Sequence, residues 1–324
     1  MKNSLKKLVS LAAVAALGTA VLSAGPIQLD EKIPPYQSTS GVSGNLNSIG
    51  SDTLNNLMTF WAEAFKVRYP NVNIQIEGKG SATAPPALAN GTAQIAPMSR
   101  PMKKEEIAVF EKKYGYKPTE IKVSIDALGV FVNKDNPIKG LSLKQIDSAF
   151  SSTLKRGGQP VANWGALQLS GEWGSKPISL YGRNSASGTY GFFKEHALKK
   201  GDFKNSVKEQ PGSSSVVQGV ASDLGGIGYS GIGYLTAGVR ALPLSEKDGE
   251  QFIEPSYENC LNGTYPLGRF LYVYVNRAPG KPADKLTEEF LKFVLSKEGQ
   301  EIVVKDGYYP LNADLSKEGL DLLK

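Results

Sequence analysis

The chain has 324 residues, of which 40% are hydrophobic and 21% are charged, and its formal net charge is +6. This composition is typical of a globular protein long enough for two domains, and it excludes a low-complexity or disordered chain. Three of the positive charges lie at the very N-terminus, and the mild excess elsewhere predicts no nucleic-acid partner and no membrane partner.

Residues 1–24 have the pattern of a secretory signal peptide. Three lysines precede an apolar run from Leu8 to Leu22, and small residues follow. The alternative, a transmembrane anchor, is disfavoured because the run is short for a membrane span and no other stretch has about 20 apolar residues. We expect cleavage after Ala24 and export of a mature chain that is not inserted in a membrane.

The chain has one cysteine, Cys260, and one histidine, His196. A single cysteine excludes an internal disulfide, and no cysteine follows the signal peptide to carry a lipid. We expect the Cys260 thiol to be a small buried apolar group, which is the commoner state of a lone cysteine. Zinc sites need several cysteine or histidine ligands, so we predict no metal ion and no cofactor.

After a polar leader rich in Pro, Gly and Ser at residues 25–45, short strands and helices alternate. Alternating apolar residues predict strands, and apolar residues three and four apart predict helices. We expect strands at 45–51, 72–78, 93–99 and 121–137, and helices at 51–70, 83–91 and 103–115. This order predicts a mostly parallel sheet, which binds ligands at the carboxyl ends of its strands.

The second half of the chain repeats the alternation. We expect helices at 142–152, 187–199, 215–225 and 284–307, and strands at 177–183, 225–235 and 270–277. Two long extended passages, "IDALGVFVN" (125–133) and "GRFLYVYVN" (268–276), resemble each other although they lie far apart. They predict two crossings between two α/β lobes. We place the first lobe at residues 46–127 plus 270–324 and the second at residues 128–269.

Three segments share one local design, in which a strand ends in Gly and Ser or Thr and a helix begins at once. They are "GSDTLNN" (50–56), "GKGSATAPPAL" (78–88) and "GRNSASGTYGFF" (182–193). The first N–H groups of a helix have no intrahelical partner, and the helix N-terminus carries partial positive charge. One such segment is more often an ordinary helix cap. Three of them, with the planar guanidinium of Arg183, predict a site for a multivalent oxyanion.

Rival motifs are weaker. "GIGYSG" (226–231) satisfies G-x-G-x-x-G but follows a predicted helix instead of a strand, which argues against a dinucleotide site. "GKGSAT" (78–83) has neither the order nor the spacing of a P-loop. A Ser–His hydrolase needs a base beside Ser187, but His196 lies nine residues further along the chain on no shared helix face.

The segment "RNSASGT" contains an arginine, three intervening residues and Ser-Gly-Thr, and "GSDTL", "GKGSA", "MSRPM", "GGIGYSGIGY" and "YPLGRFLYVYVN" accompany it. In these motifs and their order the chain resembles the periplasmic phosphate-binding proteins of phosphate-specific (Pst) ABC transporters, within the type II periplasmic binding proteins. The resemblance runs from about Leu46 to Tyr309. It implies two α/β lobes, each a central sheet flanked by helices, joined by a hinge and closing on phosphate.

The resemblance also implies roles for single residues. In the second lobe, Arg183 would be the charged clamp. Ser187 and Thr189 would donate from their hydroxyl and amide groups, and Gly188 would donate from its backbone N–H.

In the first lobe, the resemblance implies donors at two helix N-termini, Ser81 at one and the loop of Ser51, Asp52 and Thr53 at the other. Ser99 departs from the family, because some members have there an aspartate that accepts the proton of bound phosphate. The location of the proton acceptor in this chain is therefore open.

Phosphate near neutral pH keeps a proton and sulfate does not, so a carboxylate beside the anion favours phosphate. Asp52 is our first candidate for this acceptor, with an N-cap on its own helix as the alternative. Asp126, at the first crossing, is the second candidate, with a structural hydrogen bond at the hinge as the alternative. Arg100 is expected to pair with one of these aspartates or with the ligand, unless it forms only a weak surface pair.

These observations predict an exported, monomeric solute-binding protein without enzymatic activity. It would bind inorganic phosphate in the periplasm and deliver it to the membrane permease of an ABC transporter. The nearest alternative is a binding protein for another oxyanion, such as sulfate, molybdate or a phosphonate. A further alternative, a secreted phosphatase or esterase that uses Ser187, lacks an evident base.

Overall fold

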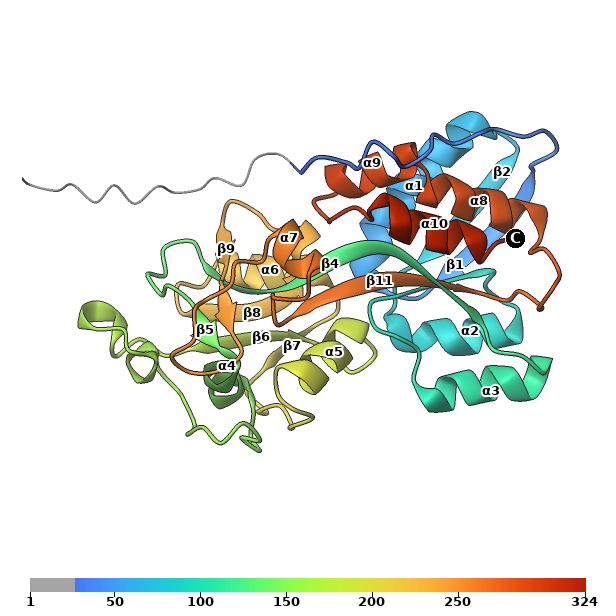
Figure 1. Ribbon diagram of the computed structural model, residues 1–324. Helices are drawn as coiled ribbons and strands as arrows, with labels where there is room; N and C mark the ends of the chain where they lie inside the picture. Colours follow the sequence, from blue (N-terminus) through green and yellow to red (C-terminus); the bar gives the residue numbers. More distant parts are fainter. Residues whose placement is uncertain (1–26) are drawn as a thin grey trace, which may run out of the picture.

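The computed structural model describes residues 27–324 (Figure 1). The predicted signal peptide at residues 1–24 lies outside the described residues. Across residues 27–324, no helix has both the length and the apolar character that a membrane crossing requires.

A nine-stranded sheet runs through the protein in the order β2-β1-β3-β11-β4-β8-β6-β7, with β9 paired to β4, and a separate two-stranded sheet joins β10 and β5. The strands are β1 (Gly44–Ile49), β2 (Val72–Glu77), β3 (Ile95–Met98), β4 (Thr119–Asn133), β5 (Leu141–Ser142), β6 (Ser179–Arg183), β7 (Lys208–Gln210), β8 (Gly226–Gly231), β9 (Val239–Ala241), β10 (Leu244–Ser245) and β11 (Gly268–Val275).

Helices cover both halves of this sheet (Figure 1). The α-helices are α1 (Asn55–Arg68), α2 (Ala84–Asn90), α3 (Lys104–Tyr114), α4 (Leu143–Phe150), α5 (Gly188–His196), α6 (Ser213–Ala221), α7 (Tyr257–Leu261), α8 (Lys285–Leu295), α9 (Lys297–Lys305) and α10 (Ala313–Asp321). Short 3₁₀ helices are η1 (Asp52–Leu54), η2 (Ser81–Thr83), η3 (Trp164–Leu167), η4 (Gly171–Trp173) and η5 (Ile232–Tyr234).

Strand β4 joins the two halves. Its residues Thr119–Ala127 pair with β11, whereas Leu128–Val132 pair with β8. In Figure 1, β4 and β11 run side by side between the half that carries α1, α2, α3 and α8 and the half that carries α4, α5 and α6. We call these the first and the second half.

Strand direction differs between the outer strands and the crossing strands. β1 pairs in parallel with β2 and β3, and β6 pairs in parallel with β7 and β8. β4 and β11 are antiparallel to their neighbours. The predicted α/β fold is confirmed, and its parallel pairing is interrupted by the antiparallel pairing of the two extended passages that cross between the halves.

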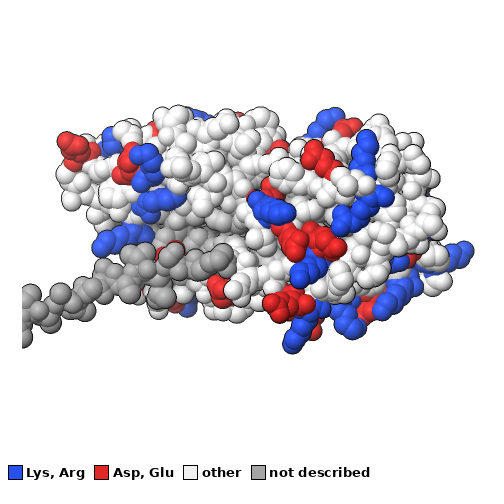
Figure 2. Space-filling model, turned by 90° about the horizontal axis from the view of Figure 1, so that it is seen from above, with Lys and Arg blue, Asp and Glu red and all other residues white. Residues whose placement is uncertain are grey.

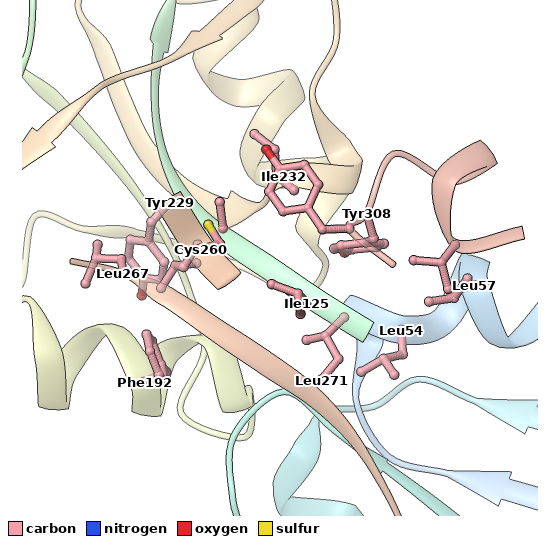
Figure 3. Close-up of a cluster of buried hydrophobic side chains, with 14 of the residues drawn as sticks. Leu54, Leu57, Ile125, Phe192, Tyr229, Ile232, Cys260, Leu267, Leu271 and Tyr308 are labelled. Atoms are coloured by element: carbon pink, nitrogen blue, oxygen red, sulfur yellow. The ribbon is translucent and has the colours of Figure 1, made fainter. Parts of the chain in front are cut away.

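The hydrophobic core is continuous across the crossing. Figure 3 shows Ile125 of β4 and Leu271 of β11 between Leu54 of the first half and Tyr229 of the second. Cys260 is also buried in this core, and burial raises the pKa of its thiol, as expected for an apolar packing residue and not for a nucleophile.

The described part of the leader packs on the first half, over α1 and α9 (Figure 1). Ile33 is buried. The Tyr36 hydroxyl donates to Glu289 Oε2 at 2.7 Å and lies 2.7 Å from the Tyr69 hydroxyl. Composition alone predicts a flexible leader here. The structure instead anchors the segment through the buried Ile33 and the partly buried Tyr36, and their apolar contacts and hydrogen bonds offset the cost of ordering the chain.

Candidate anion-binding site

The first wall of the site forms where β1 and β3 end. Ser51 follows β1, and its Oγ caps η1 by accepting the Thr53 N–H at 3.2 Å, while the Ser51 N–H donates to Pro97 O at 2.8 Å. A Cβ at Gly50 would overlap Pro97 O, so only glycine allows β1 and β3 to approach this closely. The hydroxyl of Ser51 is thereby fixed at the carboxyl edge of the sheet.

Ser81 and Ser99 lie at the same edge. Gly80 has φ +115°, a conformation that favours glycine, and it leads directly into η2 at Ser81. Ser99 follows β3, and its N–H donates to Ser81 Oγ at 3.0 Å. The Ser99 Oγ is 3.3 Å from Ser81 Oγ and accepts from Ser51 Oγ at 3.0 Å. Three buried serine hydroxyls from three loops therefore meet, because the carboxyl ends of parallel strands share one edge.

The second half contributes the N-terminus of α5. Ser187 Oγ caps this helix by accepting the N–H groups of Thr189 at 3.1 Å and Tyr190 at 3.3 Å. A Cβ at Gly188 would overlap the hydroxyls of Ser81 and Ser99, so the bare backbone of Gly188 faces the first half. The structure thus brings the N-terminus of α5 against the serines of the opposite half.

Thr53 and Thr189 complete this contact, since their Oγ1 atoms lie 2.9 Å apart across the two halves. We call the side chains of Ser51, Thr53, Ser81, Ser99 and Thr189 the hydroxyl cluster. All of them are buried. Each hydroxyl can both donate and accept, so the cluster can satisfy itself in one state and donate to an anion in another.

Arg183 ends β6 beside the cluster, and its side chain is 1% exposed. Its Nη1 donates to Ser213 Oγ at 2.7 Å and lies 3.1 Å from Asp52 Oδ2, and its Nη2 donates to Pro211 O at 3.1 Å. Burial lowers the pKa of Arg183, and the Asp52 carboxylate opposes this shift. The buried Nε has no hydrogen-bond partner among residues 27–324, which leaves a donor for a ligand.

Asp52 reaches across to the second half. Its Oδ2 accepts the Ser213 N–H at 2.8 Å at the N-terminus of α6, next to Arg183. Its own helix is capped by Ser51, so Asp52 does not serve as the N-cap there. The carboxylate therefore binds a cation and a helix N-terminus that belong to the opposite half.

Asp126 lies in β4 directly opposite Arg269 of β11. Its Oδ1 accepts the Ile232 N–H at 2.9 Å, and its Oδ2 accepts Arg269 Nε at 2.8 Å and lies 2.7 Å from Arg269 Nη2. Burial raises the pKa of Asp126, and the Arg269 guanidinium counteracts this rise. Both carboxylate oxygens already have protein donors.

Arg269 is the residue of this site that sequence reasoning misses. Its Nη1 donates to Ser99 O at 2.9 Å and its Nη2 donates to Thr189 Oγ1 at 3.0 Å, so it contacts the cluster in both halves. The available signal was an arginine inside the apolar passage "GRFLYVYVN", where a buried charge needs a partner.

Arg100 points away from the cluster. Its two Nη atoms donate to the Glu106 carboxylate at 2.8 and 2.7 Å. Its side chain pairs with Glu106, and the expected pairing with Asp52 or Asp126 does not occur. Sequence reasoning misses this partner, because Glu106 lies beyond the loop that contains Arg100, in the first turn of α3.

Two further features concern His196 and the charges on one face of the molecule. The His196 ring packs on Phe192 with 4.1 Å between ring centroids, and no hydrogen bond joins it to Ser187 in the described part of the chain. On the face in Figure 2, Lys and Arg side chains are interspersed with Asp and Glu.

Comparison with known proteins shows the family to which this chain belongs. Residues 36–298 match the model of the PBP superfamily domain. The chain is 58% identical to the phosphate-binding protein PstS of Pseudomonas aeruginosa over 98% of both chains. It is also similar to a solved structure described as a putative phosphate ABC transporter substrate-binding protein with bound phosphate from Clostridium perfringens. The two chains are 25% identical and superpose with a TM-score of 0.70, over 83% of this chain and 100% of the other.

An ABC-type phosphate transport receptor from Vibrio cholerae shares the fold, with a TM-score of 0.63 and 22% identity over 82% of this chain and 100% of the other. The two-lobe α/β architecture expected from the sequence is thus confirmed. The chain belongs to the PBP superfamily and, within it, to the PstS family.

Proposed function

We propose that the protein binds inorganic phosphate and delivers it to the permease of an ABC transporter. The observation that carries this proposal is the meeting of two halves at the hydroxyl cluster, together with Arg183, whose guanidinium contacts Asp52 and whose buried Nε has no hydrogen-bond partner among residues 27–324. The similarity to PstS proteins, whose name states phosphate binding, supports the same ligand.

The binding residues in this proposal are those at the three helix N-termini, the serine that follows β3, and one arginine. The proposed ligand donors are Ser51, Thr53, Ser81, Ser99, Arg183, Ser187, Gly188 and Thr189. Hydrogen bonds to a charged ligand contribute about 1.5–3 kcal/mol each, so several of them in a closed site suffice for tight binding without covalent chemistry.

Asp52 is the better of the two candidates for the acceptor of the phosphate proton. Both oxygens of Asp126 accept from N–H groups, and Arg269 lies between Asp126 and the cluster. Asp52 uses only Oδ2 for Ser213 and Arg183, and its side chain remains partly exposed. Its other oxygen is available to a ligand that carries a proton, and it would repel sulfate.

We further propose that the halves act as two lobes, residues 46–127 plus 270–324 and residues 128–269, that close by a hinge motion at β4 and β11. The cross-lobe contacts Thr53–Thr189 and Asp52–Arg183 would then form on closure. In this proposal the chain is exported through its signal peptide, acts as a monomer in the periplasm, and needs no cofactor and no catalysis.

Calorimetric titration with inorganic phosphate, repeated in excess sulfate, tests the function. We expect saturable binding of one phosphate per chain that sulfate does not displace. Absence of phosphate binding, or equal binding of sulfate, would contradict it. Incubation with a chromogenic phosphate ester should release no product, and turnover would instead indicate a phosphatase.

A further inference from the structure

Arg269 occupies a special place between the two halves. It extends from β11, a strand of the crossing, and its side chain is 2% exposed. It contacts the hinge through Asp126, the first half through Ser99 O, and the second half through Thr189 Oγ1. The guanidinium therefore contacts both halves at once, at the edge of the hydroxyl cluster.

The guanidinium is held rigidly. Asp126 Oδ2 binds two of its nitrogens, and Asp126 is itself fixed by the Ile232 N–H at 2.9 Å. The Phe192 ring packs over the guanidinium carbon at 5.3 Å from the ring centroid. A planar fork with several partners loses little freedom when it forms a further bond, so it can fix the geometry of its neighbours.

The direction of the bond to Thr189 follows from chemistry. A guanidinium can only donate, so Thr189 Oγ1 must accept from Arg269 Nη2 at 3.0 Å. One lone pair of the hydroxyl is thereby used, and its hydrogen is left to donate elsewhere. In the structure the neighbouring oxygen is Thr53 Oγ1 at 2.9 Å. In a complex, the same hydrogen can point to an anion.

We propose that Arg269, held by Asp126, is a positioning residue of the phosphate site that makes Thr189 a hydrogen-bond donor to the ligand. This role rests on the proposed phosphate-binding function. In this role the buried Arg269–Asp126 pair does not contact the ligand itself. It acts on the ligand through Thr189, at the N-terminus of α5.

A double-mutant cycle on phosphate affinity tests the proposal in the full mature chain. Arg269→Met together with Asp126→Asn removes the pair without leaving an unpaired buried charge. We expect this double substitution to weaken phosphate binding about tenfold or more, and Thr189→Val alone to do the same. When the double substitution is added to Thr189→Val, phosphate affinity should fall by less than about threefold further, because both changes remove the same hydrogen bond.

The substitution Arg269→Lys provides a second test of the positioning role. It keeps a positive charge beside Asp126 but cannot hold three partners at once, so we expect a loss of affinity with thermal stability near that of the wild type. Lys122→Met is the control, since Lys122 lies on β4, the strand that carries Asp126, but pairs with Glu318 at 3.2 Å away from the cluster. It should bind phosphate as the wild type does.

The outcomes separate the two proposals. A wild-type chain that does not bind phosphate overturns the proposed function and this inference with it. A wild type that binds, with unchanged affinity in the Arg269 variants, overturns the inference alone. Losses that multiply independently with Thr189→Val also overturn it, because Arg269 would then not act through Thr189.

Discussion

Two arginine–aspartate pairs flank the hydroxyl cluster, and they are built differently. Arg183 and Asp52 come from opposite halves and make one contact of 3.1 Å, and the Asp52 side chain is 21% exposed. Arg269 and Asp126 come from neighbouring strands and make contacts of 2.8 and 2.7 Å, with side chains 2% and 0% exposed. The first pair has to separate if the halves part, whereas the strand ladder keeps the second together.

This difference in burial and setting indicates that the two arginine–aspartate pairs have different roles. An ion pair between moving parts can exchange its partner for a ligand, so Arg183 is suited to bind the anion. An ion pair within a continuous sheet has a fixed geometry, so Arg269 is suited to hold other groups in place. Substitutions at the first pair should therefore change mainly phosphate affinity, whereas substitutions at the second pair should change folding stability as well as affinity.

The largest effect is expected where the fixed pair is broken on one side. Arg269→Met should lower the free energy of unfolding by about 3–5 kcal/mol, because Asp126 stays buried without its cation. A carboxyl whose folded pKa is raised, as burial raises that of Asp126, stabilises the folded state at low pH and loses this contribution as the pH rises through the folded pKa. Urea unfolding at pH 7 and pH 5 should show the variant regaining stability relative to the wild type at the lower pH.

The control for this prediction is Arg269→Met combined with Asp126→Asn, which should recover most of the lost stability because no unpaired charge remains. If Arg269→Met alone unfolded like the wild type at both pH values, the buried pair would not be the fixed element described above.

Breaking the exchangeable pair should mainly change affinity. We expect Arg183→Met to weaken phosphate binding about 100-fold, or by about 3 kcal/mol, because charge-assisted hydrogen bonds to the ligand are lost. Stability should fall less than in Arg269→Met, since water can reach the released Asp52 carboxylate. Calorimetry measures the affinity.

Arg156→Met is a matched control in the same half, because Arg156 pairs with Glu246 at 3.0 Å away from the cluster. It should bind phosphate normally. An Arg183 variant with wild-type affinity would remove Arg183 from the site.

A smaller and more selective effect is expected at the aspartate of the exchangeable pair. Asp52→Asn should reduce the preference for phosphate over sulfate by about tenfold, since the amide can donate to sulfate and no longer repels it. Asp126→Asn, whose carboxylate is turned toward Arg269, should leave the preference unchanged. Competition titrations with sulfate measure both ratios, and an unchanged ratio in Asp52→Asn would exclude it as the proton acceptor.

The smallest effect on affinity is expected at a third pair, Arg100 with Glu106, which lies outside the cluster. Arg100→Met should change phosphate affinity less than about twofold, but it should lower stability by about 1–3 kcal/mol, because the pair is mostly buried and has two charge-assisted hydrogen bonds. Thermal unfolding and calorimetry measure the two values. A large loss of affinity would show that Arg100 contacts the ligand in the complex.

Much of the fold and part of the site can be predicted from local sequence. The strand ends at Gly50, Gly78 and Gly182 combine glycine with small hydroxyl residues before a helix, and parallel strands bring such ends to one edge. This rule places Ser51 and Ser81 at one edge without knowledge of the strand register, whereas Ser99 is expected there only from the family resemblance.

The rest depends on contacts between distant segments. The pairing of Arg269 with Asp126 needs the register of two strands, which no local pattern encodes. Asp52 has the local pattern of a helix cap, and only the placement of α6 reveals its partner in the other half. The leader likewise has a loop composition, and its packing depends on Tyr36 reaching Glu289 far along the chain.

Strand β4 has a mechanical consequence, because it continues without a break from its pairing with β11 to its pairing with β8. No flexible loop separates the halves along this strand, so a change in the angle between them must be absorbed as extra twist of the crossing strands. Such a change in twist would consist of small changes in the backbone dihedral angles of many residues. In the proposed hinge motion, resistance to opening would therefore be distributed along the backbone of the crossing strands.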